Sequence, residues 1–406
     1  MDHPAARASA SGPDAITAAL GRIPSLLAGY WAFGQFWGIW VVVITTFNRT
    51  RAIDDAAYGL YLTVLSVSAV LVMALGAPRL AGLPLRISMP LGISMLGLGS
   101  FLMAYLPTPW LALSMVVIGA GNGLVDVFAN VATQRVEMVT GRPALQWLHA
   151  SYALGGITGA TAAGVAAARG VDLRAVMFAG GLALFAVSWW NVRRGDPLPG
   201  EAVAGTRLSV SAFRRHPGLF AAGSVVLFAF LVEGAMDTWA GRYVQETLDA
   251  SASKAAVVFV TFSASLFLGR MFAGKILFGL GRRATILIGG AVAAVAGVAI
   301  VATQHLVVIG GAYLVMGFAL SMVAPAAFGL VEDRAAGDQA NAIAAVTTLG
   351  YAGFVFSPPL VGLVAQRFGL RAAMALVFSC TAGVLVAGWV VREGGPEAAP
   401  DVTSSR

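Results

Sequence analysis

Residues 193–216 read RRGDPLPGEAVAGTRLSVSAFRRH and form the longest polar segment between two apolar runs of this 406-residue chain. The segment lies near the middle of the sequence, with six apolar runs before it and six after it. An apolar run of about 20 residues is long enough to cross a bilayer as an α-helix. The polar segment therefore divides the chain into two halves of equal helix number, and such a division is typical of two structurally similar halves.

The apolar runs predict an all-α integral membrane protein with twelve transmembrane helices in two six-helix bundles. Their approximate bounds are 24–47, 57–77, 86–106, 109–135, 145–168, 173–192, 217–243, 254–276, 284–303, 306–331, 340–365 and 370–391. We expect five parts: a disordered cytoplasmic N-terminal tail (1–22), a first bundle (23–192), a cytoplasmic linker (193–216), a second bundle (217–392) and a cytoplasmic C-terminal tail (393–406).

The composition supports lipid as the main solvent. Hydrophobic residues make up 58% of the chain and charged residues 11%, with a mean hydropathy of +0.81. A soluble domain carries about 25% charged residues. The net charge of +7 comes from arginines that lie singly or in pairs between apolar runs, which is not the pattern of a nucleic-acid surface. Most of the 26 basic residues fall on the N-terminal side of the membrane, so both termini are predicted to face the cytoplasm.

Asn122, Asp126 and Asn130 lie four residues apart in the run 109–135, and this spacing places them on one helical face. An ionisable group inside a membrane costs about 2.5–3.5 kcal/mol on insertion scales and therefore tends to face a wet cavity or a partner. We interpret Asp126 and the two amides as a cavity-facing site for a solute or a proton. The alternative is a hydrogen-bond clamp between helices.

Glu233 and Asp237 share a face of the run 217–243, one helical turn apart. Two like charges this close in an apolar medium favour the uptake of a proton by one of them. Proton coupling requires a group of this kind. The alternative for Asp237 is a position in the outer interfacial zone beside Arg242.

Further candidates lie on the runs 24–47 and 145–168. Trp31 and Gln35 belong to an aromatic segment that could hold a sugar-like or cationic solute, or could face lipid or the interface. His149 and Tyr152 begin the run 145–168. Histidine titrates near neutral pH and could relay protons, or it could cap and pack near the cytoplasmic helix end.

Two features predict gating. Arg270 lies near the inner end of the run 254–276, where we expect it to pair with a loop acid or a helix C-terminus and to latch the inner gate. Pro358 and Pro359 interrupt the backbone hydrogen bonds of the run 340–365. The resulting kink could be a gating hinge or a fixed shape.

Enzyme signatures are absent from the sequence, which has neither a glycine-rich phosphate loop with Lys-Ser or Lys-Thr nor a His-Glu-x-x-His pair. Cys380 is the only cysteine. We therefore expect no enzymatic activity, no cofactor and no metal site.

Several segments together resemble the major facilitator superfamily over about residues 22–392. The glycine- and arginine-rich signature of that family matches GAPR at 76–79 through Arg86, and again Gly269-Arg270 through Arg282-Arg283. The first copy lacks the usual acidic residue, and Lys275 stands near its place in the second. GNGLVDVFANVATQRVE (121–137), GRPALQWLHASYALGG (141–156) and FLVEGAMDTWAGRYV (230–244) are similar to a branch of MosC-like and fucose-permease-like proteins.

The resemblance implies two pseudo-symmetric bundles and a central cavity lined by the runs 24–47, 109–135, 217–243 and 306–331. It also implies a gating role for Arg79 and Arg270. We expect a monomeric, proton-coupled secondary transporter of the bacterial inner membrane that moves a sugar, polyol or amino-polyol by alternating access. These four runs have no arginine or lysine deep within them, which disfavours a multiply charged anion. The alternatives are a proton-driven drug or metabolite exporter and a non-transporting membrane receptor or scaffold.

Overall fold

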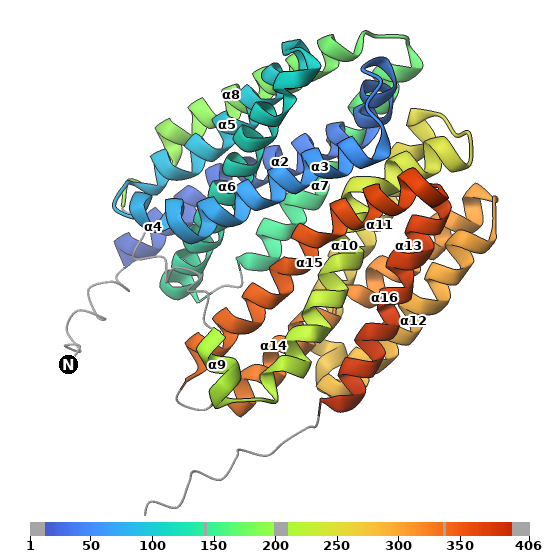
Figure 1. The fold of residues 1–406 in the computed structure, drawn as a ribbon. Coiled ribbons are helices and arrows are strands. Elements are labelled where there is room, and N and C mark those ends of the chain that lie inside the picture. Colours follow the sequence, from blue (N-terminus) through green and yellow to red (C-terminus); the bar gives the residue numbers. More distant parts are fainter. Residues whose placement is uncertain (1–12, 142–143, 199–209, 336–337, 392–406) are drawn as a thin grey trace, which may run out of the picture.

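The computed structural model describes residues 13–141, 144–198, 210–335 and 338–391, and the secondary-structure elements in these ranges are helices. Figure 1 shows two bundles of long helices, with the blue-to-green half of the chain beside the yellow-to-red half. Across the interface, α3 packs against α15 and α7 packs against α11. The two halves therefore contribute matching pairs of helices to their shared interface.

The helices of the first bundle are α2 (Pro13–Thr50), α3 (Asp55–Leu71), the π-helical turn η1 (Val72–Gly76), α4 (Ala77–Leu80), α5 (Leu85–Tyr105), the 3-10 turn η2 (Thr108–Trp110), α6 (Leu111–Thr140), α7 (Leu145–Ala168) and α8 (Leu173–Arg194). The short helix α9 (Val210–Arg215) precedes the second bundle. That bundle contains α10 (Leu219–Thr247), α11 (Ala252–Leu280), α12 (Arg282–Ala302), α13 (Leu306–Leu320), α14 (Val323–Arg334), α15 (Gln339–Phe368) and α16 (Leu370–Val390).

Each of the twelve predicted runs coincides with a helix or with consecutive helical segments in the described ranges. Eleven spans in these ranges are long and apolar enough to cross a membrane. The remaining long helix, α7, has 24 residues, and its glycines together with the polar residues His149, Ser151, Thr158 and Thr161 lower its hydropathy. One boundary was wrong: α2 begins at Pro13, so residues 13–22 of the predicted N-terminal tail are helical.

Glycines bring α2 and α7 into backbone contact. A Cβ atom at Gly38 would lie 2.2 Å from the carbonyl oxygen of Gly156, and one at Gly159 would lie 2.3 Å from that of Gln35. Small residues allow membrane helices to approach this closely. The contact fixes which face of α2 turns toward α7 and which face remains for the centre of the molecule.

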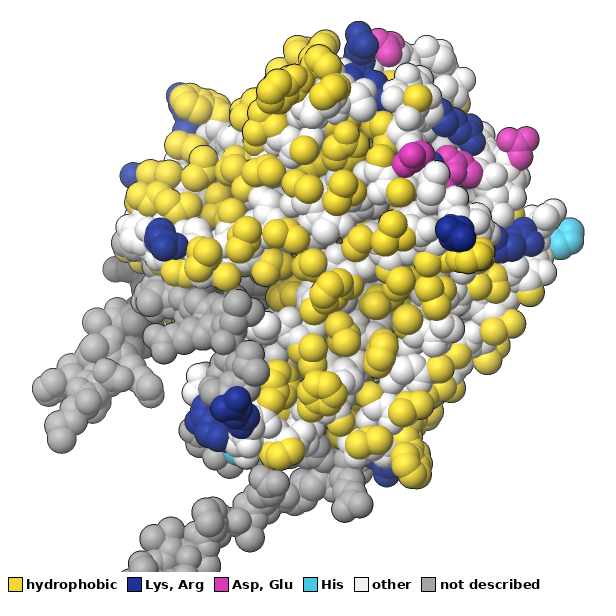
Figure 2. Space-filling view, viewed as in Figure 1, with side chains coloured by type: hydrophobic (Ala, Val, Ile, Leu, Met, Phe, Trp, Pro, Cys, Tyr) yellow, Lys and Arg dark blue, Asp and Glu magenta, His cyan; other side chains and the backbone are white. Residues whose placement is uncertain are grey.

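The surface separates into an apolar belt and two polar ends. Figure 2 shows hydrophobic side chains across the middle of the visible face, with basic side chains toward both ends of the bundles and the visible acidic side chains toward one of them. We call the end at which α2 begins and α8 and α16 end the terminal end. The other end, which carries the connections 51–54, 169–172, 248–251 and 303–305, is the distal end. The belt between them has the arrangement of a membrane-spanning protein.

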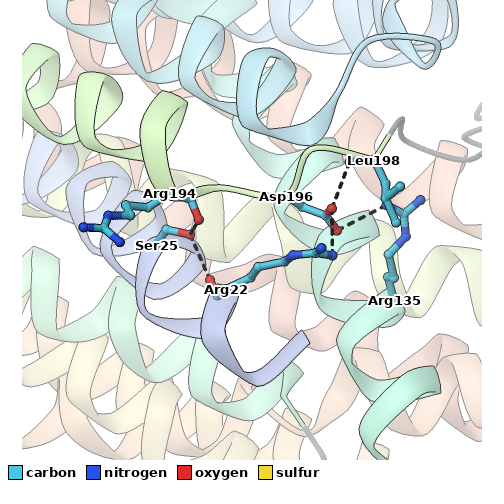
Figure 3. Close-up of polar contacts among 6 residues, drawn as sticks. All are labelled: Arg22, Ser25, Arg135, Arg194, Asp196 and Leu198. Atoms are coloured by element: carbon cyan, nitrogen blue, oxygen red, sulfur yellow. Dashed lines mark hydrogen bonds and ion pairs between the residues drawn. The ribbon is translucent and has the colours of Figure 1, made fainter. Parts of the chain in front are cut away.

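The start of the linker is fastened to the first bundle at the terminal end. Asp196 forms ion pairs with Arg22 (2.9 Å) and Arg135 (3.3 Å), and it accepts a hydrogen bond from the backbone N–H of Leu198 (Figure 3). The backbone N–H of Arg86 donates to the carbonyl oxygen of Asp196 (2.8 Å). The described beginning of the linker thus belongs structurally to the first bundle. The rest of the predicted linker, over 199–209, lies outside the described residues.

Candidate functional site

A cavity of about 440 Å³ lies between the two bundles, and its walls come from α2, α3, α6, α7, α10, α11 and α15. A volume of this order falls in the range of small-ligand sites. The polar and aromatic lining is Tyr30, Trp37, Ser66, Asn122, Asp126, Asn130, His149, Tyr152, Glu233, Asp237, Thr238, Ser263, Arg270 and Tyr351, with Phe33, Phe230, Phe267 and Phe354. Asn122, Asp126 and Asn130, which were predicted to share one face of the run 109–135, all line this cavity.

Asp126 is the centre of a hydrogen-bonded cluster that joins the two bundles. Its Oδ1 atom accepts from the Tyr30 hydroxyl (3.1 Å) and the Asn130 amide (3.3 Å). Its Oδ2 atom accepts from the Tyr351 hydroxyl of α15 (3.4 Å), which belongs to the second bundle. A carboxylate accepts from all three donors, whereas a protonated carboxyl must donate through one oxygen. A change in the protonation of Asp126 thus alters a direct contact between the bundles.

Glu233 pairs with Arg270, and this pairing corrects the sequence prediction. The Arg270 Nη2 atom lies 3.0 Å from the Glu233 Oε1 atom, and both side chains line the cavity. The predicted partner, a loop acid or a helix C-terminus, is therefore wrong. The four expected lining runs did not include α11, and α11 brings Arg270 into the cavity. Arg270 was expected at the inner end of α11 from its position along the helix, but its helical face turns toward the cavity.

Asp237 lines the cavity one turn along α10 from Glu233. The guanidinium of Arg242, beside which the alternative placed Asp237, instead pairs with Asp55 and Glu246. Among the described residues, the Asp237 carboxyl has no hydrogen-bond or ion-pair partner.

His149 and Tyr152 line the cavity from α7. Both rings lie next to the ring of Tyr30, at centroid distances of 5.9 and 5.6 Å. Asn122 faces the cavity too, where its Oδ1 atom accepts a hydrogen bond from the Trp37 indole (3.2 Å). These contacts place an aromatic wall beside the acids.

Gln35 and Trp31 were predicted to contact the solute, but neither lines the central cavity. The two residues are four apart and share the α2 face that meets α7: a Cβ atom at Gly155 would lie 1.9 Å from the carbonyl oxygen of Trp31. The side chain of Gln35 lines a separate space of about 20 Å³. Tyr30, Phe33 and Trp37 occupy the cavity-facing side of α2 instead.

The remaining predictions concern α13, Arg79 and the proline pair. None of the described residues of α13 or α14 lines the cavity, although the run 306–331 was expected to do so. Arg79 is exposed on α4 and donates to the carbonyl oxygen of Leu75 in the preceding turn. Helix α15 continues through Pro358 and Pro359, and Pro358 lines the cavity.

An aromatic layer closes the distal side of the cavity. The rings of Tyr58 and Trp239 meet edge to face at 4.7 Å, and the Trp40 indole N–H donates to the Tyr58 hydroxyl (3.4 Å). The Tyr58 hydroxyl donates in turn to the carbonyl oxygen of Thr238 (2.9 Å). All three aromatic side chains are buried. Because Trp40 and Tyr58 belong to the first bundle and Trp239 to the second, the layer spans the interface.

A network of ion pairs lies distal to this aromatic layer. Arg242 of α10, with a side chain only 7% exposed, pairs across the interface with Asp55 (2.6 Å) and along its own helix with Glu246 (3.0 Å). Arg49 approaches Glu246 from the first bundle at 4.0 Å. The guanidinium of Arg242 also lies over the rings of Tyr58 and Trp239.

The backbones of α3 and α15 touch beside this network. A Cβ atom at Gly59 would lie 2.7 Å from the carbonyl oxygen of Pro358 and 3.0 Å from the Cα atom of Gly362. Near the same end, the Ser253 hydroxyl donates to the carbonyl oxygen of Gly164 across the interface (2.8 Å). Aromatic, ionic and glycine contacts together seal the distal end of the molecule.

Comparison with known proteins agrees with this architecture. Residues 25–358 match the family model described as Major Facilitator Superfamily. An uncharacterised MFS-type transporter of Yersinia pestis is 28% identical over 86% of this chain and 88% of its own length. Membrane protein MosC of Rhizobium meliloti is 22% identical over 86% of this chain and 84% of its own length.

Solved structures of transporters share the fold. The nucleoside transporter NupG superposes with a TM-score of 0.72 at 14% identity, covering 91% of this chain and 98% of NupG. A bacterial homologue of the human lysosomal transporter Spinster, in an inward-facing and occupied conformation, superposes with a TM-score of 0.72 at 13% identity, covering 91% and 96%.

Proposed function

The chain belongs to the major facilitator superfamily, and we propose that it is a proton-coupled secondary transporter whose bundles expose the cavity to each side of the membrane in turn. The observation that carries this proposal is a cavity with buried acids between two bundles, sealed at its distal end by contacts between those bundles. We assign the present conformation to the state that opens toward the terminal end.

Proton coupling rests on two acids. Asp126 accepts hydrogen bonds from both bundles, so proton uptake there changes their mutual contact. Glu233 is held by Arg270, and a proton on Glu233 would free the guanidinium to meet the solute. The proposed sequence is proton and solute binding, separation of the distal contacts, and release on the other side.

The solute in this proposal is small and polar: a sugar, a polyol or an amino-polyol. The amide of Asn122 and the hydroxyl groups of Ser66, Thr238 and Ser263 line the cavity and can hydrogen-bond such a molecule. The aromatic side chains beside them supply flat faces for its ring or carbon chain. We further propose a monomer in a bacterial inner membrane, with the terminal end in the cytoplasm, because most basic residues lie on that side.

A proton-driven exporter is the second candidate function. Three carboxyl groups share the cavity with one guanidinium, so a cationic solute and protons would compete for the same acids. Competition of this kind favours exchange of solute for protons, whereas simultaneous binding favours uptake together with protons.

Proteoliposomes with an internal pH dye test the proposed function. Sorbitol, glucose, glucamine and glucosamine are added in turn under zero membrane potential. We expect at least one of these solutes to change the internal pH in protein-containing vesicles only, inward flux of protons indicating symport and outward flux indicating exchange. The absence of a proton signal together with accumulation of a labelled solute would leave transport standing and exclude proton coupling. No flux of any kind would contradict the proposal.

A further inference from the structure

The cavity contains more acidic than basic side chains, and this excess indicates the sign of the charge on the solute. Asp126, Glu233 and Asp237 contribute three carboxyl groups, whereas Arg270 is the one arginine or lysine among the described lining residues. His149 adds the one imidazole among the described lining residues. An apolar membrane protein stabilises unpaired charge poorly. The site is therefore built to accept positive charge, and an anion would meet net repulsion.

The three acids differ in their partners. Asp126 accepts three hydrogen bonds from Tyr30, Asn130 and Tyr351, and Glu233 is paired with Arg270. Asp237 has no such partner among the described residues, although it lies in the same cavity one helical turn from Glu233. Of the three carboxyl groups, Asp237 is the one whose hydrogen-bonding capacity is left for a bound molecule.

Aromatic side chains surround the same space. Tyr152 of the first bundle lines the cavity together with Asp237 and Glu233. Phe230 and Phe354 line it in mutual contact, with ring centroids 4.7 Å apart. Aromatic faces attract cations, and this attraction is strongest where water is excluded. An unpartnered carboxylate beside aromatic rings is the combination that recognises a substituted ammonium group.

We propose that the transported solute carries a protonated amine and that Asp237 is its counter-ion in the cavity. This inference rests on the proposed transport function and narrows its solute to the amine-bearing class. The hydroxyl groups of such a solute meet the polar side chains Asn122 and Thr238. The single positive charge of the solute reduces the surplus of carboxylates over guanidinium groups in the cavity.

A matched series of solutes tests this proposal on the purified full-length protein in detergent. Glucamine, sorbitol and gluconate share a six-carbon hydroxylated chain and differ in an ammonium, hydroxyl or carboxylate group; benzylamine, benzyl alcohol and benzoate repeat the comparison on an aromatic scaffold. Binding is measured by titration calorimetry. In at least one scaffold we expect the ammonium compound to bind about tenfold or more tightly than the hydroxyl compound, as an added ion pair of moderate strength gives, with the carboxylate compound weakest.

Asp237→Asn removes the charge and keeps the shape, so the preference for the ammonium compound should disappear. The control is Asp249→Asn, because Asp249 is an exposed acid in the distal connection outside the cavity, and this variant should retain the wild-type preference. Equal affinities for the three compounds within both series would overturn the proposal. Absence of binding by all six compounds would overturn it as well. So would an unchanged preference in Asp237→Asn. The assay detects binding without transport, so a failed proton-flux experiment and a failed preference for amines remain distinguishable.

Discussion

Asp126→Asn is expected to abolish solute-driven proton flux. The asparagine side chain fits the same space and can still accept a hydrogen bond from Tyr30 or Tyr351, but it cannot take up or release a proton. Loss of a group that must transfer a proton typically lowers a rate by about 10²–10⁴-fold, and we expect a fall of this order in proteoliposomes that report pH. Solute exchange across the membrane, which moves no net proton, should persist in the same vesicles.

The control for this variant is Asn130→Ala. Asn130 donates to the same carboxyl group (3.3 Å) but does not titrate, so its loss should reduce proton flux by less than about tenfold, as the loss of one hydrogen bond of about 1 kcal/mol does. If Asp126→Asn retained proton flux at the level of Asn130→Ala, Asp126 would be a structural clamp between helices rather than a proton site.

Arg242→Gln is expected to open the distal end. The substitution leaves Asp55 and Glu246 without their common cation, and breaking a buried ion pair by removing one partner costs about 3–5 kcal/mol. Asp55 and Glu246 keep 19% and 23% of their side chains exposed, so solvent reduces that cost. A remaining difference of about 1–3 kcal/mol still changes the ratio of the two conformations by about 5- to 150-fold. The population of the state closed at the distal end should therefore fall by this factor relative to the state open at that end.

Spin labels at Val171 and Gln304 measure this change, because both residues are exposed in distal connections of different bundles. The variant should lengthen the distance between the labels. Gly59→Ala should do the same, since its added Cβ atom would lie 2.7 Å from a backbone oxygen of α15. Gly310→Ala is the matched control, with no atom within 4 Å of the added carbon. Unchanged distances in both gate variants would show that these contacts do not hold the distal end closed.

The helices and the two-bundle division were predictable because apolar length and the central polar segment are local properties of the sequence. The acids Asp126 of α6 and Glu233 and Asp237 of α10 were predictable as well. In each helix a spacing of four residues places the polar side chains on one face, and the cost of burying them in a membrane points to a cavity. Residues from distant segments, such as Tyr351 beside Asp126, could not be placed in this way, because pairing across bundles depends on how α6 and α15 dock.

The wrong predictions for Gln35 and Trp31 could have been avoided by comparing the two faces of α2. Tyr30, Phe33 and Trp37 follow the spacing of one α2 face, whereas Gln35 lies on the opposite face among the glycines that meet α7. The partner of Arg270 was harder to predict. Its pairing with Glu233 joins two adjacent helices at a depth that the sequence does not specify. The distal network around Arg242 was missed because its members lie on α2, α3 and α10, far apart along the chain.

The most direct test of alternating access is the accessibility of the cavity from each side of the membrane. Ser66 lines the cavity, so Ser66→Cys is made together with Cys380→Ala, which removes the only native cysteine. A membrane-impermeant maleimide is added to either side of oriented vesicles, and Gln304→Cys marks the distal face. We predict that Ser66→Cys reacts from the terminal side in the otherwise unchanged protein, and from the distal side once Arg242→Gln is introduced. Labelling from one side only in both proteins, or from both sides at equal rates, would contradict a cavity that opens to the two sides in turn.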